Sequence, residues 1–211
     1  MDIVRSPLSL SLSILLTLVS LEDESTVLKY DCALHNLRAG VEEFLCRDGL
    51  PLERLHEAAL HGDPPSSPTL LDALGRLHGV DSLPESWKEA ISINRKQGHV
   101  RERALQDSEA YEAFVQTYER FVEEVVCAEM GAAKCYVQRP PTLRIHLAGL
   151  EPASGKIGFH RDRDYPNHVA TEINFWVPLV DVGGANSLFV EATDGGGDFD
   201  PVEARVGEYF R

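Results

Sequence analysis

A histidine and an aspartate two positions apart are the residues of this chain best suited to chemistry. His160 and Asp162 lie in the stretch GFHRDRDY, which spans 158–165. Side chains on a strand alternate faces with a period of two, so both point the same way at a strand end. Imidazole and carboxylate are two parts of the 2-His-1-carboxylate triad, which holds Fe(II) and leaves positions open for oxygen and an organic co-substrate. The alternative interpretation is a charged surface turn.

The strands around this pair carry further polar groups on a shared face. Arg144 and His146 have one parity in the stretch TLRIH, and the apolar residues between them have the other. In the stretch EINFWV, Asn174 lies opposite Ile173 and Phe175 in the same way. A sheet with one apolar face against helices and one polar face around a cavity has this pattern. Arg144 and Asn174 are therefore the groups that we expect near an anionic co-substrate, because Arg donates two parallel hydrogen bonds to a carboxylate. The alternative is that the polar face is exposed to solvent and binds no ligand.

The elements that must position these residues change type along the chain. Apolar residues recur at helical spacing over 34–45, 52–62, 68–79 and, most strongly, over 109–130, where Asp107 or Ser108 can cap the start and Gly131 suits the stop. After Gly131 the period becomes two. Short strands are predicted at 134–137, 142–147, 156–162, 171–179, 187–191, 202–205 and 208–210. The fold class is therefore α+β, with residues 25–131 as a helical region and 132–211 as a β region within one domain.

The composition and net charge limit the kinds of partner that the chain can bind. The 211 residues carry a formal net charge of −14, and 43% of them are hydrophobic. An acidic chain repels phosphate backbones and anionic lipids, so nucleic acid and membrane surfaces are poor partners. The four cysteines show no C-x-x-C spacing and are expected to be ordinary buried thiols. The scattered histidines of the N-terminal half, His35 among them, are expected at the surface or in helix caps.

Residues 1–24 form an apolar N-terminal segment with two interpretations. Its length suits the apolar region of a secretory signal, but Asp2 and Arg5 cancel in charge. The stretch LSLSLS also alternates as a half-buried strand does. The cytoplasm is the favoured compartment, and secretion is the alternative.

The C-terminal stretches together resemble a known family. The ordered series PTLRIHL, GFHRDRDY, EINFWVPL and NSLFVE, within residues 138–211, is similar to the core of the Fe(II)/2-oxoglutarate dioxygenase-like proteins of streptomycin-biosynthesis type. The resemblance implies N-terminal helices packed on an incomplete double-stranded β-helix, a jelly-roll or cupin-like fold. It implies Fe(II) as cofactor and 2-oxoglutarate as co-substrate, in an oxygenase that oxidises a C–H bond of a small molecule, in secondary metabolism.

The resemblance also assigns roles to residues. His160 and Asp162 match the metal-binding His-x-Asp of the family. Asp164 and Tyr165 match its pattern as well, and a contact to a metal ligand or to substrate is the role we expect for them. The family supplies a second iron-binding His near the end of the jelly roll, and no His follows His168 in this chain. His168 or His146 is the substitute ligand that the sequence offers.

This missing ligand leaves other interpretations open. The chain is expected to be a truncated product, inactive as written although its family is enzymatic. The competing function is a non-catalytic jelly-roll module that binds a carbohydrate or another small ligand.

Overall fold

The computed structural model describes the larger elements of the chain. These are residues 9–17, 26–45, 85–89, 108–131, 136–138, 141–146, 172–184, 187–191 and 195–211.

The predicted long helix is present and continuous in the chain. It consists of α6 (Glu109–Phe121), the π-helical turn η3 (Val122–Val126) and α7 (Cys127–Glu129). Ser108 caps its start, because the Tyr111 N–H donates to the Ser108 Oγ at 3.1 Å. Gly131 follows its end with φ of +58°, the left-handed conformation common after a helix.

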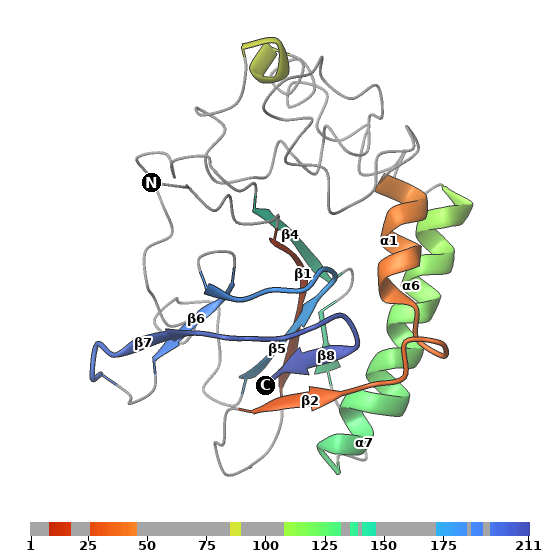
Figure 1. Cartoon of the computed structure of the whole chain (residues 1–211). Coiled ribbons are helices and arrows are strands. Elements are labelled where there is room, and N and C mark those ends of the chain that lie inside the picture. The colour runs from red at the N-terminus through yellow and green to blue at the C-terminus, as the bar shows by residue number, and fades with distance from the viewer. Residues whose placement is uncertain are drawn as a thin grey trace.

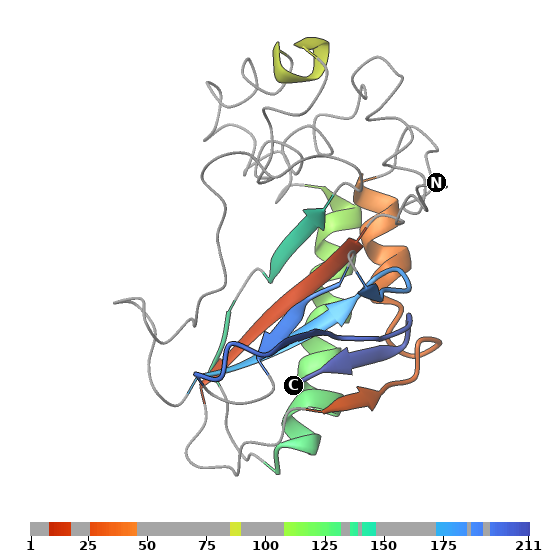
Figure 2. The ribbon, with the colours of Figure 1, turned by 60° about the vertical axis from the view of Figure 1, so that its left-hand side comes forward.

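A shorter helix, α1 (Leu37–Leu45), lies beside α6 along one face of the sheet (Figures 1 and 2). It begins three residues later than the apolar spacing predicts. Asn36 explains the start, since its Oδ1 accepts a hydrogen bond from the Ala39 N–H at 3.0 Å, as an N-cap does. Among the described helices, none combines the length and the apolar composition that a membrane span requires.

An antiparallel sheet forms the second layer (Figure 1). Its strands run in the order β2-β8-β5-β1-β3, and β4 pairs with β1 beside β3. Their bounds are β1 (Ser9–Thr17), β2 (Val27–Lys29), β3 (Tyr136–Val137), β4 (Thr142–His146), β5 (Glu172–Pro178) and β8 (Glu208–Phe210). A separate two-stranded sheet contains β6 (Phe189–Glu191) and β7 (Phe199–Pro201).

Near the start of β5 the two faces of the strand differ in burial, as the sequence predicts. Phe175 and Val177 are fully buried, whereas Asn174 between Ile173 and Phe175 is exposed. Phe175 belongs to an aromatic cluster that joins sheet to helix. The Tyr209 ring lies 6.1 Å from that of Phe175 and 5.9 Å from that of Phe121 on α6. Burial of these rings fixes which face of the sheet meets the helices.

One long hairpin connects the two sheets. Trp176 lies opposite Phe210, and the pairing of Val182 with Ala204 continues the same register, six residues further along each arm. Val190 then lies opposite Asp200, so the first arm holds four additional residues before β6. These extra residues interrupt the ladder of backbone hydrogen bonds between the two arms, and the interruption separates β6 and β7 from the larger sheet. At the tip, the Glu191 carboxylate accepts hydrogen bonds from the N–H groups of Gly195 and Gly197 at 2.9 and 2.8 Å.

The structure corrects several sequence-based expectations. β2 lies within the stretch predicted to be helical, and β7 lies earlier than the strand predicted at 202–205. The N-terminal apolar segment forms β1, in agreement with its strand interpretation, and β1 sits between β4 and β5. The sheet therefore combines strands from both ends of the chain. The helices predicted at 52–62 and 68–79 and the strand at 156–162 lie outside the described residues.

The α+β class is confirmed, while the jelly roll remains a prediction. The described strands form small antiparallel sheets and close no barrel. The cysteine prediction fails for Cys127, which is disulfide-bonded. Cys32 is a free, half-buried thiol, as predicted.

Gly207 provides a test of how tightly β8 meets the segment after β2. Its φ is +93°, and a Cβ placed there would lie 2.8 Å from the Cys32 Sγ. Gly131 has a similar φ of +58° but no atom within 4 Å of such a Cβ. Gly131→Ala should therefore cost about 1 kcal/mol of unfolding free energy from backbone strain alone. Gly207→Ala should cost more, because the side chain must also displace a neighbour.

Urea denaturation of the two variants beside the unchanged protein measures the difference. Equal losses of stability would show that the close approach of Gly207 to Cys32 is wrong.

Candidate functional site

The predicted metal ligands fall in a part of the chain that the structure does not describe. His160, Asp162, Asp164 and Tyr165 all lie outside the described residues, as does the substitute ligand His168. Their roles therefore stay predictions. Within the described residues, no group of three or more His, Cys, Asp and Glu side chains is arranged to hold a metal ion.

Arg144 and Asn174 can be placed by strand register. Arg144 of β4 lies opposite Ser11 of β1, and Asn174 of β5 lies opposite Leu15. Ser11 and Leu15 are four residues apart, so their positions have the same parity and share a face of the sheet. This is the face opposite Phe175 and therefore opposite the helices. The two positions thus share a face in the register, as their parity predicts, and Trp176 on the same face is buried.

The same register separates the two positions along the sheet. Four residues of strand span roughly 13 Å. A single carboxylate therefore cannot reach both Arg144 and Asn174, and a ligand bound by Arg144 would have Asn174 toward its other end. The row between them contains Ser13, Thr142 and Trp176.

The serines of β1 were not singled out from the sequence as part of this face. Ser9, Ser11 and Ser13 take the positions opposite His146, Arg144 and Thr142. The alternation of Leu and Ser that predicts a strand also predicts one hydroxyl-bearing face, but the sequence gives no sign that this strand lies between β4 and β5. The polar face is therefore built by three strands that are distant in sequence.

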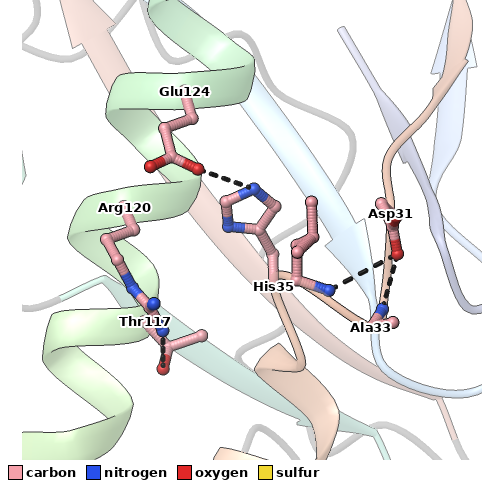
Figure 3. A network of polar contacts seen from close by, with 7 residues as sticks. Asp31, Ala33, His35, Thr117, Arg120 and Glu124 are labelled. Atoms are coloured by element: carbon pink, nitrogen blue, oxygen red, sulfur yellow. Dashed lines mark hydrogen bonds and ion pairs between the residues drawn. The ribbon is translucent and has the colours of Figure 1, made fainter.

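A concave feature lies on the helix side of the sheet. A cleft of about 570 Å³ opens between the segment from β2 to α1 and the helical turns η3 and α7. Asp31, Glu124 and Glu129 line it, together with Lys29 and His35. Figure 3 shows His35 facing Glu124 of η3, while Asp31 turns toward Ala33.

His35 is buried, contrary to its prediction as a surface or cap residue. Its side chain is 4% exposed, and its ring meets the Phe121 ring edge-on at 5.9 Å. The Nε2 lies 3.3 Å from the Glu124 Oε2. The Nδ1 is buried and has no hydrogen-bond partner among the described residues. A buried polar atom without a partner costs about 1–3 kcal/mol, so this atom is a candidate for a role outside folding.

The turn η3 helps to place Glu124. Its π-helical hydrogen bond joins the Cys127 N–H to the Val122 carbonyl, which inserts an additional residue into the helix. Such insertions occur frequently at functional sites, because they alter the direction of the side chains that follow. No propensity pattern in the sequence identifies this turn, so sequence reasoning missed both Glu124 and its contact with His35.

Tyr209 forms part of the cleft wall, and its hydroxyl is perturbed. Burial of the ring and, to a smaller extent, the Glu129 carboxylate raise the pKa of Tyr209 to about 12, while the Arg211 guanidinium opposes the shift. Burial also raises the pKa of Tyr30, with Cys32 adding to the effect. Both hydroxyls therefore keep their protons throughout the neutral range.

The chain is similar to one curated protein over part of its length. It is 38% identical over 91 residues to "Streptomycin biosynthesis protein StrG" of Streptomyces griseus. The similarity covers 43% of this chain and 39% of that protein. The chain thus spans about two fifths of the curated relative that it matches, and the similarity supports a relationship of streptomycin-biosynthesis type. No protein-family model matches the chain, and no solved structure matches it.

The tyrosine pKa values predict an alkaline loss of stability. The folded chain holds the Tyr209 proton more tightly than the unfolded chain, whose pKa is near 10.0. This contribution to stability is therefore complete below pH 10 and is lost as the pH rises toward 12. Unfolding free energies measured by urea titration between pH 9 and 12 should fall, and Tyr209→Phe should reduce the slope.

Tyr136→Phe is the matched control, because that ring is 83% exposed. It should reproduce the curve of the unchanged protein. A Tyr209→Phe curve that falls as steeply as the control would contradict the assignment.

Proposed function

We propose that the chain is an Fe(II)- and 2-oxoglutarate-dependent oxygenase-like protein that acts on a small molecule in secondary metabolism. The relationship to a streptomycin biosynthesis protein supports the metabolic setting. The resemblance of residues 138–211 to Fe(II)/2-oxoglutarate dioxygenase-like proteins supports the chemistry. The chain matches only part of that relative, so the oxygenase activity assigned to the whole protein is itself a proposal.

The observation that carries the proposal is the register of β4, β1 and β5. It gives the sheet one face packed on α6 and a second face that Arg144, Asn174 and the serine positions of β1 share, with Arg144 and Asn174 four residues apart along β1. An Arg beside hydroxyl groups is suited to an anionic co-substrate, since its planar fork donates two parallel hydrogen bonds to a carboxylate. In the proposal, Arg144 binds a carboxylate of 2-oxoglutarate, and Asn174 contacts the far end of the bound molecules.

His160 and Asp162 hold the metal in this proposal. Imidazole nitrogen and carboxylate oxygen are the donors that non-haem Fe(II) takes, so the donor set fits the ion. When bound, the iron supplies the oxidation, and the protein supplies ligation, orientation and exclusion of side reactions. His168 or His146 is the third ligand that the chain itself offers. Asp164 and Tyr165 orient a ligand or contact substrate.

Anaerobic titration tests the metal and the co-substrate together. Adding Fe(II) and then 2-oxoglutarate to the purified chain should produce the visible charge-transfer absorption of a chelated keto acid on iron. His160→Ala should lower Fe(II) affinity by more than the roughly 10–100-fold that removal of an outer partner costs. Aerobic incubation with Fe(II) and 2-oxoglutarate should then release succinate only where this absorption forms.

His99→Ala is the matched control, since it removes an imidazole from a position to which no ligand role is assigned. Its absorption should equal that of the unchanged chain. Absence of any 2-oxoglutarate-dependent absorption, or its persistence in His160→Ala, would exclude the oxygenase. Saturable binding of a small ligand that a chelator does not alter would instead favour the non-catalytic binding module.

A further inference from the structure

The pairing of β1 with β3 and β4 contains two more residues on one side than on the other. Thr142 of β4 lies opposite Ser13, and Val137 of β3 lies opposite Leu16. Between these two pairs β1 has two residues, whereas the opposite side has four, residues 138–141. An insertion of this kind is a bulge, which disrupts the ladder of backbone hydrogen bonds locally. The position of β4 along β1 therefore depends on how the insertion is held.

The sequence of β1 does not fix this position by itself. Leu and Ser alternate over residues 8–13, so this part of the strand repeats every two residues. In the observed register Arg144 lies opposite Ser11. A slip of β4 by two residues would place Arg144 opposite Ser9 and would leave the apolar and polar positions of both strands on the same faces. The slipped register would also need no bulge, because residues 138–141 would then continue the ladder of β3.

Tyr118 of α6 makes the contact that distinguishes the two registers. Its side chain is fully buried, and its hydroxyl donates a hydrogen bond to the Gln138 carbonyl in the insertion at 2.8 Å. Burial and, to a smaller extent, the Glu119 carboxylate raise the pKa of Tyr118, so the hydroxyl keeps its proton and remains a donor. In a continuous ladder the Gln138 carbonyl would lie in the plane of the sheet, turned away from the helix layer. The buried hydroxyl would then lose its acceptor, which disfavours the slipped register.

We propose that Tyr118 is a positioning residue that selects the register in which Arg144 lies opposite Ser11. The choice sets the distance between Arg144 and Asn174, because Asn174 lies opposite Leu15. The separation along β1 is four residues, roughly 13 Å, in the observed register and would be six residues, roughly 20 Å, after the slip. The consequence for 2-oxoglutarate rests on the proposed function, since Tyr118 acts on its binding only through the position of Arg144.

Cysteine cross-linking of β1 to β4 measures the two registers. Thr142→Cys combined with Ser13→Cys reports the observed register, and Thr142→Cys combined with Ser11→Cys reports the slip, because residues directly opposite in a sheet lie within disulfide range. Peptide mass spectrometry identifies the joined pair. Tyr118→Phe removes the hydroxyl and keeps the ring. It should raise the rate of the slipped cross-link relative to the observed one by at least about fivefold, the factor that one net hydrogen bond contributes.

Removal of the insertion provides a rescue. Deletion of residues 139–140 leaves two residues on each side between the flanking pairs, so uninterrupted pairing already places Arg144 opposite Ser11. Addition of Tyr118→Phe to this deletion should therefore leave the ratio of the two cross-linking rates unchanged.

Val115→Ala is the matched control on α6. Val115 is 3% exposed, so its truncation lowers stability through a cavity but leaves the hydrogen bond between Tyr118 and Gln138 in place. Its ratio of cross-linking rates should equal that of the unchanged chain. A constant ratio in Tyr118→Phe, an equal rise in Val115→Ala, or a rise that persists in the deletion variant would overturn the inference.

The cross-linked chains also separate the register from the proposed function. With Fe(II) and 2-oxoglutarate, the chain locked in the observed register should form the charge-transfer absorption. The chain locked in the slipped register should form it only after the disulfide is reduced. Equal absorption in the two locked chains would overturn the role of the register in co-substrate binding. No absorption in any chain, together with a ratio that rises in Tyr118→Phe, would exclude the oxygenase and support the register selection.

Discussion

The alternation of side chains along β5 is the constraint on which the rest of the structure depends. Phe175 and Val177 are buried, and the Phe175 ring meets Tyr209, which in turn contacts Phe121 of the long helix. A slip of one residue in this strand would turn these rings to the opposite face and bring Asn174 and Trp176 toward the helices. Burial of the aromatic cluster thus fixes the register, and the register fixes which residues can surround a ligand on the other face.

The same cluster also connects the two candidate sites. Tyr209 belongs to the sheet, to the aromatic cluster and to the wall of the cleft that His35 and Glu124 line. One face of the sheet carries the polar positions of β4, β1 and β5. The helix side carries an acidic cleft at the β2–β8 edge. A change that loosens the cluster would affect both, whereas changes at Arg144 or Glu124 would affect one.

Local sequence signals predicted the elements with strong periodicity. The helix after Ser108, the strand parity of β4 and β5, and the position of β8 all follow from spacing and from cap residues. Those signals depend only on residues that are close in the sequence, so they can be recognised without knowledge of the fold. The α+β class follows from the same change of period after Gly131.

Features that depend on distant pairing were not predictable in this way. The place of β1 between β4 and β5 joins residues more than a hundred positions apart, and β2 becomes a strand by pairing with β8. The π-helical turn and the burial of His35 against Phe121 also arise from packing. Of the candidate site, the sequence predicted the shared face of Arg144 and Asn174 but not their separation along β1.

Paramagnetic broadening tests the central claim most directly. Mn(II), which accepts the same nitrogen and oxygen donors, would replace Fe(II) in the presence of 2-oxoglutarate. The account predicts that the Asn174 side-chain amide and the Trp176 indole N–H broaden strongly in the unchanged chain but not in His160→Ala, while the Val125 amide in the cleft does not broaden. Broadening strongest at Val125, or broadening that persists in His160→Ala, would contradict a metal site on the polar face.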